Sequence, residues 1–331
     1  MNITIVGAGA IGSYIAARLL MSGQPVSLLA RGQTLAALQS RGLGLQDQDQ
    51  AVRYLPVVAT EDTSRLGPQD LVIVAVKEPA LAALIPALRA LIGPETHLLT
   101  AMNGIPWWFS AGLPGTAPQP LGSLDPDGQL AKLIAPERII GCVLHMACTQ
   151  PQPGVCRHVM GNRMLLGDAL RQPADQPSAM LMQAADALGK AGFEVQTSAY
   201  IHKDIWFKLW GNMTHNPISA LTRATTDQII ADPLTCELAV SVMQEAQRVG
   251  ARIGCQLDQD PVARNQEALK LGAFKTSMLQ DAEAGKALEY NALLGAFVEL
   301  ATRLDEPVPM ARTLLGLIRL LDRNNRSAGH A

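Results

Sequence analysis

The 331-residue sequence is poor in aromatic and charged residues. Aromatic side chains make up 4% of the chain and charged side chains 17%, and the 27 Lys and Arg nearly balance the 29 Asp and Glu. The same balance holds on both sides of residue 199, so neither half has the basic surplus of a nucleic-acid-binding domain. A hydrophobic share of 48% excludes a disordered chain and is sufficient for about two domain cores.

The sequence also lacks a long apolar run, and we expect no leader segment. One of the longest aliphatic stretches covers residues 71–76. It is much shorter than the roughly 18 residues that a membrane helix needs. No basic segment precedes the glycines that begin at Gly7, so a secretory signal is not expected. We therefore expect neither a membrane nor a nucleic acid as a partner.

Cysteine is scarce, and its count of five does not suit a framework of disulfides. A reduced, cytoplasmic compartment is the simplest interpretation. The alternative is a metal site made of Cys142, His145, Cys148, Cys156 and His158. This set lacks the close cysteine pairs of structural zinc sites, and a strand over residues 139–149 would point His145 away from Cys142 and Cys148. We expect buried thiols and no metal.

Apolar runs alternate with helical patterns up to residue 199. Strands are expected at residues 2–6, 26–29, 71–76, 97–101 and 193–197, with two or three more within 139–168. Helices are expected after residue 9, at 33–39, at 79–91 with a break or late start at Pro86, and before Lys190. This alternation is typical of a parallel sheet covered by helices.

From about Tyr200 the strand patterns end and long amphipathic helices follow. They are expected at residues 202–224, 234–253, 262–283, 291–304 and 308–322. The sequence thus predicts an α/β domain at 1–199 and an all-helical domain at 200–331. Residues 105–128, rich in Pro and Gly, are predicted to form a long loop, and long loops in compact domains tend to be functional.

Gly7, Gly9 and Gly12 form a G-x-G-x-x-G pattern between an expected strand and an expected helix. Such glycines permit a tight turn and bring the backbone close to a pyrophosphate at the helix N-terminus. Ala10 and Ile11 complete this candidate dinucleotide-binding loop. The alternative is a strand–helix turn without a ligand.

The second expected strand ends at Arg31 and offers no acidic residue. NAD-binding loops place an acid about 20 residues after the glycines, where it holds the ribose 2′-hydroxyl. A guanidinium at this point suits a 2′-phosphate instead, so the pattern favours NADP. The alternative is that Arg31 is a solvated cation.

Lys208, Asn212 and Asn216 recur every four residues and therefore share one face of an expected helix. Bulky apolar neighbours favour the neutral amine and a lower pKa of Lys208, as suits a group that donates a proton to a carbonyl oxygen. An ordinary helix lysine that extends its ammonium into solvent is an equal alternative. His215 lies between the two asparagines, and we expect it to be structural or solvated.

Taken in order, these motifs resemble the ketopantoate reductase (2-dehydropantoate 2-reductase) family. The matching pieces are residues 7–12, Arg31, Val76-Lys77, Asn103-Gly104, Lys208 to Pro217, residues 277–281 and Glu289. The resemblance implies an N-terminal Rossmann domain that binds NADP, an all-helical C-terminal domain, and a 2-oxo acid substrate between them. The implied reaction is the NADPH-dependent reduction of 2-dehydropantoate to pantoate in pantothenate biosynthesis.

The resemblance also implies a role for each matching residue. Lys208 would protonate the substrate oxygen, and Glu289 would orient or tune Lys208. The substrate would be bound by Asn103, Asn212, Asn216 and Ser277, and the cofactor by Gly7, Gly9, Ala10, Ile11, Gly12, Arg31, Lys77 and Asn103. Without the resemblance, Ser277 would be interpreted as a helix cap or an exposed hydroxyl, Glu289 as a surface carboxylate and Asn103-Gly104 as a turn.

The four tryptophans fall into two pairs beside these residues, Trp107 with Trp108 and Trp206 with Trp210. Compact members of the family carry small residues after the Asn-Gly, so an aromatic wall or lid over the substrate is one interpretation. The other is that the first pair packs the loop onto the sheet. Alternative functions are a paralogous reductase of another 2-oxo acid and a non-catalytic NADP sensor, and a homodimer is as compatible as a monomer.

Overall fold

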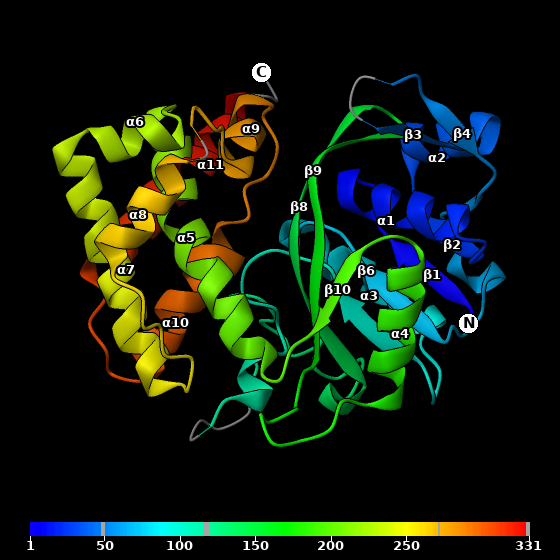
Figure 1. The fold of residues 1–331 in the computed structure, drawn as a ribbon, viewed down its shortest axis with the longest axis horizontal. Coiled ribbons are helices and arrows are strands. Elements are labelled where there is room, and N and C mark those ends of the chain that lie inside the picture. The colour runs from blue at the N-terminus through cyan, green and yellow to red at the C-terminus, as the bar shows by residue number, and fades with distance from the viewer. Residues whose placement is uncertain (48–49, 115–118, 271, 329–331) are drawn as a thin grey trace. The chain divides into compact units, whose positions relative to one another are not determined.

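The computed structural model describes residues 1–47, 50–114, 119–270 and 272–328 (Figure 1). The chain forms two compact units. Met1–Met102 and Gln129–Asp204 make up the first, here called the α/β unit, and Asn103–Gly128 and Ile205–Ala331 the second, here called the helical unit.

The described strands of the α/β unit form one sheet with the order β4-β3-β9-β8-β7-β6-β1-β2-β5, and β10 also pairs with β9. From β5 to β8 all neighbours are parallel, as predicted, whereas β8–β9 and β3–β4 are antiparallel. Their bounds are β1 Ile3–Val6, β2 Val26–Leu29, β3 Leu43–Asp47, β4 Arg53–Leu55, β5 Val58–Thr60, β6 Leu71–Val74, β7 His97–Thr100, β8 Ile139–Gln152, β9 Val155–Asp168 and β10 Glu194–Thr197.

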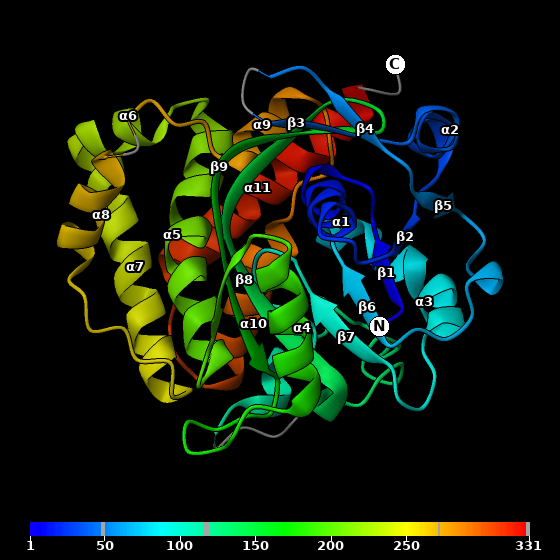
Figure 2. The same cartoon turned by 45° about the vertical axis from the view of Figure 1, so that its right-hand side comes forward.

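Helices α1 (Ala10–Met21) and α4 (Ala179–Lys190) pack against each other and against β9 (Figure 2). They share an apolar core with the strands, and the central strands β1 and β6 are buried along their whole length. Helix α2 (Gly32–Arg41) packs on β5. Helix α3 (Ile85–Leu91) starts late, with Pro86 in its first turn, as the sequence predicted.

The sequence did not predict β3, β4 and β5. They are short, and β4 is largely exposed, so their apolar pattern is weak. Gly44 in β3 is required by packing, because a Cβ there would lie 2.7 Å from Cγ2 of Val155 on the neighbouring strand. A glycine within a strand often marks such a close approach. In the sequence alone, however, the same glycine looks like a turn residue.

The hairpin of β8 and β9 carries three of the cysteines. Cys142 and Cys148 pack against the same apolar core, as the strand alternation predicted, and all five cysteines are free thiols. Burial raises the pKa of Cys148 and of Cys156 to about 12. Within the described ranges no three His, Cys, Asp or Glu side chains are placed to hold a metal ion.

The helical unit contains helices and loops but no strand among its described residues, as predicted. Helix α7 contacts α6, α8, α10 and α11. The bounds are α5 Ile201–Thr222, α6 Thr226–Ala231, α7 Pro233–Arg252, α8 Pro261–Leu269, α9 Ser277–Glu283, a π-helical turn Asn291–Gly295, α10 Ala296–Arg303 and α11 Pro309–Ala328. None of the described helices combines the length and the hydropathy needed to cross a bilayer.

The single helix predicted over residues 262–283 is wrong, because α8 and α9 are separate. Gly272 has a positive φ of 61°, which does not continue a helix. Thr276 then starts α9 as its N-cap, with its hydroxyl accepting a hydrogen bond from the Leu279 N–H. The apolar periodicity continues across the gap, which is why the pattern suggested one helix.

The Pro- and Gly-rich segment is grouped with the helical unit, whereas the sequence placed it before a boundary at 199/200. Glu299 of α10 accepts hydrogen bonds from the backbone N–H groups of Gly122 and Ser123, at 2.9 and 2.8 Å. Arg303 donates to the carbonyl oxygens of Gln119 and Pro120. These bonds anchor the segment to α10, although it precedes β8 in the sequence.

Candidate functional site

The glycine loop lies between β1 and α1. Gly7 has a φ of 107°, and a Cβ there would lie 2.6 Å from Val76. A Cβ on Gly12 would lie 2.0 Å from the carbonyl oxygen of Gly7, so this glycine lets the helix approach the turn. Gly9 has open space where its side chain would be. The three glycines thus meet the three requirements of a dinucleotide loop, namely turn, close packing and access to the backbone.

The carboxyl ends of β2, β1 and β6 lie side by side in the sheet and carry the other candidate cofactor residues. Arg31 is exposed at the N-cap of α2, and Lys77 is exposed shortly after β6. The first turns of α1 and α2 contain no acidic residue. These N-termini therefore offer backbone N–H groups and positive dipole ends to an anion. The residues present fit a phosphorylated dinucleotide.

In the helical unit, Lys208 meets Asn103. Lys208 is half-buried on α5, and its Nζ donates a hydrogen bond of 2.8 Å to Oδ1 of Asn103. The backbone that follows Asn103 is also held in place, because the N–H of Ile105 donates to the carbonyl oxygen of Ala292 at 2.8 Å. Gly104 has a φ of 81°, and a Cβ there would lie 2.6 Å from the same oxygen. Asn103-Gly104 is therefore a docked segment and more than a turn.

A small cavity beside this contact brings together four of the predicted residues. Asn103 comes from the loop after β7, Asn216 from α5, Ser277 from α9 and Glu289 from the segment that precedes the π-helical turn. Its full lining is Asn103, Asn216, Ser277, Met278, Asp281, Glu289 and Leu293. Asn212 lies one turn from both Lys208 and Asn216 on α5 but is not part of this lining.

Two features of the cavity were missed from the sequence. Asp281 lies one turn after Ser277 on α9 and is 7% exposed. The i, i+4 spacing of these two polar residues was the available signal. The other feature is the π-helical turn Asn291–Gly295, in which the Ala296 N–H donates to the carbonyl oxygen of Asn291, five residues earlier. Such turns are rare and are frequent at functional sites.

The cap interpretation of Ser277 is wrong, because Thr276 is the N-cap of α9. His215 is structural, as expected. It lies 3.2 Å from the carbonyl oxygen of Gly211 and 3.1 Å from Oδ1 of Asn265. Burial lowers the pKa of His215 and outweighs the opposing effect of these hydrogen bonds.

The four tryptophans do not form an aromatic wall or lid, since all are buried and none lines the cavity. The indole N–H groups of Trp206 and Trp210 donate to the Ala246 and Met243 carbonyl oxygens of α7. Phe109 stacks on Trp206 with ring centroids 6.1 Å apart. Phe109, in the same loop as Trp107 and Trp108, therefore packs onto α5.

Two family models cover most of the chain. Residues 3–171 match "Ketopantoate reductase PanE/ApbA", and residues 200–322 match the C-terminal domain of the same family. A 2-dehydropantoate 2-reductase of Mesorhizobium japonicum is 39% identical over 97% of this chain and 98% of its own. The chain belongs to the ketopantoate reductase family. It is accordingly an NADP-dependent oxidoreductase that acts on CH–OH groups.

Solved structures show the same fold. A Ralstonia solanacearum MolK2 protein assigned as a ketopantoate reductase superposes with a TM-score of 0.92 at 46% identity, covering 98% of both chains. A D-mandelate dehydrogenase with NADH and anilino(oxo)acetate superposes with a TM-score of 0.82 at 21% identity, covering 98% of this chain and 99% of its own. The ketopantoate reductase fold is therefore also that of a dehydrogenase named for another substrate.

Proposed function

We propose that this enzyme reduces 2-dehydropantoate to pantoate with NADPH, in the route to pantothenate. The observation that carries the proposal is the 2.8 Å hydrogen bond between Lys208 and Asn103 beside a cavity lined by Asn216, Ser277 and Glu289. An ammonium, amides, a hydroxyl and a carboxylate are the groups that a small hydroxylated 2-oxo acid requires. The substrate of the Mesorhizobium relative is consistent with this chemistry.

When bound, NADPH supplies the hydride. Gly7, Gly9 and Gly12 would hold its pyrophosphate at the N-terminus of α1, and Arg31 its 2′-phosphate. Lys77 at the end of β6 would contribute positive charge at the same edge of the sheet. We assign to none of these residues the donation of the proton that the substrate oxygen needs.

Lys208 would donate that proton. As the carbonyl oxygen gains negative charge, an ammonium within hydrogen-bonding distance stabilises it and transfers a proton from Nζ. Asn103 orients this ammonium through the contact at Oδ1. Glu289 would favour the charged form of Lys208 and accept a hydrogen bond from the substrate hydroxyl, while Ser277 and Asn216 would bind its remaining polar groups.

An assay of NADPH oxidation with 2-dehydropantoate and a panel of other 2-oxo acids tests the proposal. We expect 2-dehydropantoate to have the highest kcat/KM. A higher value for another 2-oxo acid would assign the enzyme to a different substrate of the same class, an outcome that the mandelate dehydrogenase fold makes reasonable. NADPH binding without turnover of any compound would indicate a sensor and contradict the proposal.

We further propose a homodimer in the cytoplasm. Helix α11 exposes Met310, Leu317 and Leu320, with side chains 38, 49 and 47% exposed, at spacings of seven and three residues. Such spacing forms one apolar stripe, which a second copy would cover. Free thiols suit a reducing compartment. Light scattering tests the assembly, and a mass of one chain at all concentrations would refute it.

A further inference from the structure

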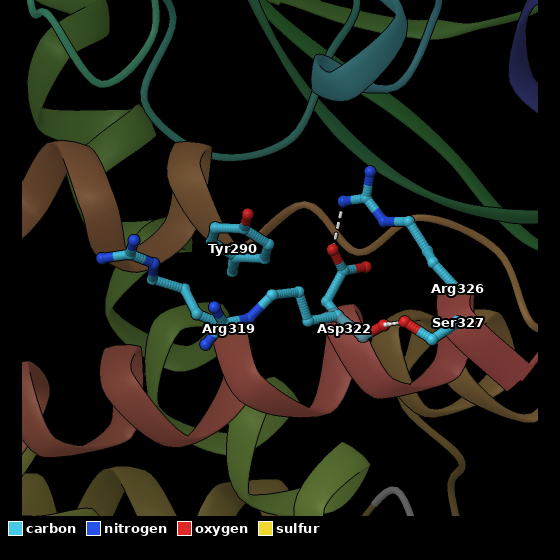
Figure 3. Close-up of a pocket in the computed structure, with 6 residues that line it drawn as sticks. Tyr290, Arg319, Asp322, Arg326 and Ser327 are labelled. Carbon is cyan, nitrogen blue, oxygen red and sulfur yellow. Dashed lines mark hydrogen bonds and ion pairs between the residues drawn. The ribbon is translucent and has the colours of Figure 1, made fainter.

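The helical unit contains a second cavity that shares no residue with the first (Figure 3). Its volume is about 440 Å³, within the range of about 300–1,000 Å³ that is usual for small-molecule pockets. It is lined mainly by one side of α11, together with the residue that follows Glu289. The lining residues are Tyr290, Arg319, Asp322, Arg323, Arg326 and Ser327.

This cavity is strongly positive. Arg319, Arg323 and Arg326 follow one another at spacings of four and three residues, so all three guanidinium groups extend from the same side of α11. Arg326 pairs with Asp322, the one carboxylate of the lining. Among the described residues, the guanidinium groups of Arg319 and Arg323 form no ion pair. The lining therefore has a surplus of two positive charges.

We propose that this cavity binds the phosphate group of a small molecule. Guanidinium groups bind phosphate oxygens through paired, charge-assisted hydrogen bonds, and the hydroxyl of Tyr290 can add a neutral donor. Arginines near a helix C-terminus also complement the helix dipole, which is the simpler reason for their presence. The helix dipole accounts for the arginines, but it does not account for Tyr290, which comes from a different segment and lines the same cavity.

The phosphate site is connected to the proposed catalytic residues through Asp322, and this part of the inference rests on the proposed function. Asp322 is 2% exposed and accepts a hydrogen bond of 3.0 Å from the backbone N–H of Leu288, the residue before Glu289. Figure 3 shows Asp322 and Arg326 rising from α11 toward the segment that carries Tyr290. A phosphate bound to Arg326 displaces this guanidinium from Asp322 and places a second anion beside the carboxylate. The repulsion between the two anions draws Asp322 away from the Leu288 N–H and thereby lowers turnover.

The binding test titrates inorganic phosphate into the full-length enzyme at constant ionic strength by calorimetry. Saturating NADP⁺ blocks the phosphate sites of the glycine loop and Arg31. We expect saturable binding that is at least about tenfold weaker in the double variant Arg319→Gln/Arg323→Gln, because charge-assisted hydrogen bonds are lost. The matched control is Arg312→Gln, an exposed arginine of α11 outside the cavity, which should bind phosphate as the wild type does.

Asp322→Asn distinguishes a phosphate site from a merely structural carboxylate. The amide oxygen of Asn can still accept from the Leu288 N–H, while Arg326 is released and a negative charge is removed. We expect tighter phosphate binding by this variant, which a structural role alone does not predict. Absence of saturable binding by the wild type, or equal affinity in the wild type and the double arginine variant, would overturn the proposal.

The connection to catalysis is tested by kinetics of 2-oxo acid reduction. Phosphate should lower kcat of the wild type and leave kcat of Asp322→Asn unchanged, because no carboxylate then competes for Arg326. If the wild type binds phosphate but its kcat is unchanged, the connection to catalysis is refuted and the phosphate site itself is still supported. Failure to reduce any 2-oxo acid would refute the proposed function, while the calorimetric result on the phosphate site would stand separately.

Discussion

The glycine loop of the α/β unit and the cavity beside the Lys208–Asn103 contact of the helical unit are built in opposite ways. The loop consists of consecutive residues, and the backbone of residues 7–12 determines its shape. The cavity collects side chains from positions 103 to 293, and its shape depends on the packing of a loop, α5, α9 and a π-helical turn. A motif of the first kind can be recognised by spacing, whereas one of the second kind exists only once the helices have packed.

The two regions also offer different chemistry. The loop presents backbone N–H groups and helix N-termini, which bind an anion but provide no proton near pH 7. The cavity is lined by amides, a hydroxyl and carboxylates, and the Lys208 ammonium is hydrogen-bonded to one of these amides, that of Asn103. If this division is real, variants of the loop should change cofactor affinity and variants of the cavity should change turnover.

Lys208→Ala should have the largest effect. Loss of a general acid typically costs about 10²- to 10⁴-fold in rate, so kcat should fall by that order while NADPH affinity stays near that of the wild type. Stopped-flow NADPH oxidation measures the first quantity and NADPH fluorescence the second. Lys203→Ala, an exposed lysine of α5, is the matched control and should remain active. Near-native turnover of Lys208→Ala would refute the proposed mechanism.

Gly12→Ala and Gly9→Ala should separate the two uses of glycine within the loop. The added Cβ of Gly12→Ala meets the Gly7 carbonyl oxygen at 2.0 Å, so we expect a destabilisation of about 1–3 kcal/mol together with loss of NADPH binding. Gly9→Ala has open space and should keep its Tm while it binds NADPH more weakly. Calorimetry and cofactor titration measure both. Unchanged NADPH affinity in Gly9→Ala would show that the pyrophosphate does not approach this position.

Arg31→Ala should change cofactor choice rather than turnover. Hydrogen bonds to charged groups contribute about 1.5–3 kcal/mol, so the ratio of kcat/KM for NADPH to that for NADH should fall by about ten- to a hundredfold. Arg41→Ala, at the other end of α2, should leave the ratio unchanged. An unchanged ratio in Arg31→Ala would identify Arg31 as a solvated cation.

Sequence reasoning predicted the parallel sheet, the helical unit and the face shared by Lys208 and Asn216, because each depends on local periodicity. It did not predict that Asp281 lines the cavity or that residues 291–295 form a π-helical turn. Both depend on tertiary packing, as does the docking of Gly104 on Ala292. The break before Thr276 was missed because the apolar periodicity continues across it.

The assignment of the tryptophans was wrong for a related reason. Proximity in sequence to Asn103 and Lys208 suggested a wall of the substrate site, but on a helix neighbours in sequence point in different directions. Trp206 and Trp210 lie on the side of α5 that faces α7, where their N–H groups are satisfied. All four tryptophans consequently belong to the helical unit and make its unfolding visible by fluorescence.

That signal allows the smallest predicted effect to be measured. The pKa of His215 is lowered from 6.5 in the folded protein, mainly by burial, so the folded state favours the neutral imidazole. The unfolded state therefore binds the proton more tightly, and the contribution of His215 to stability is complete above about pH 6.5 and is lost as the pH falls toward the lower folded pKa.

Urea unfolding followed by tryptophan fluorescence should show a smaller loss of stability between pH 7 and pH 5 in His215→Gln than in the wild type. Equal slopes in both proteins would mean that His215 is as easily protonated in the folded helical unit as in the unfolded chain, and its hydrogen bonds would then have to be assigned to the charged imidazolium.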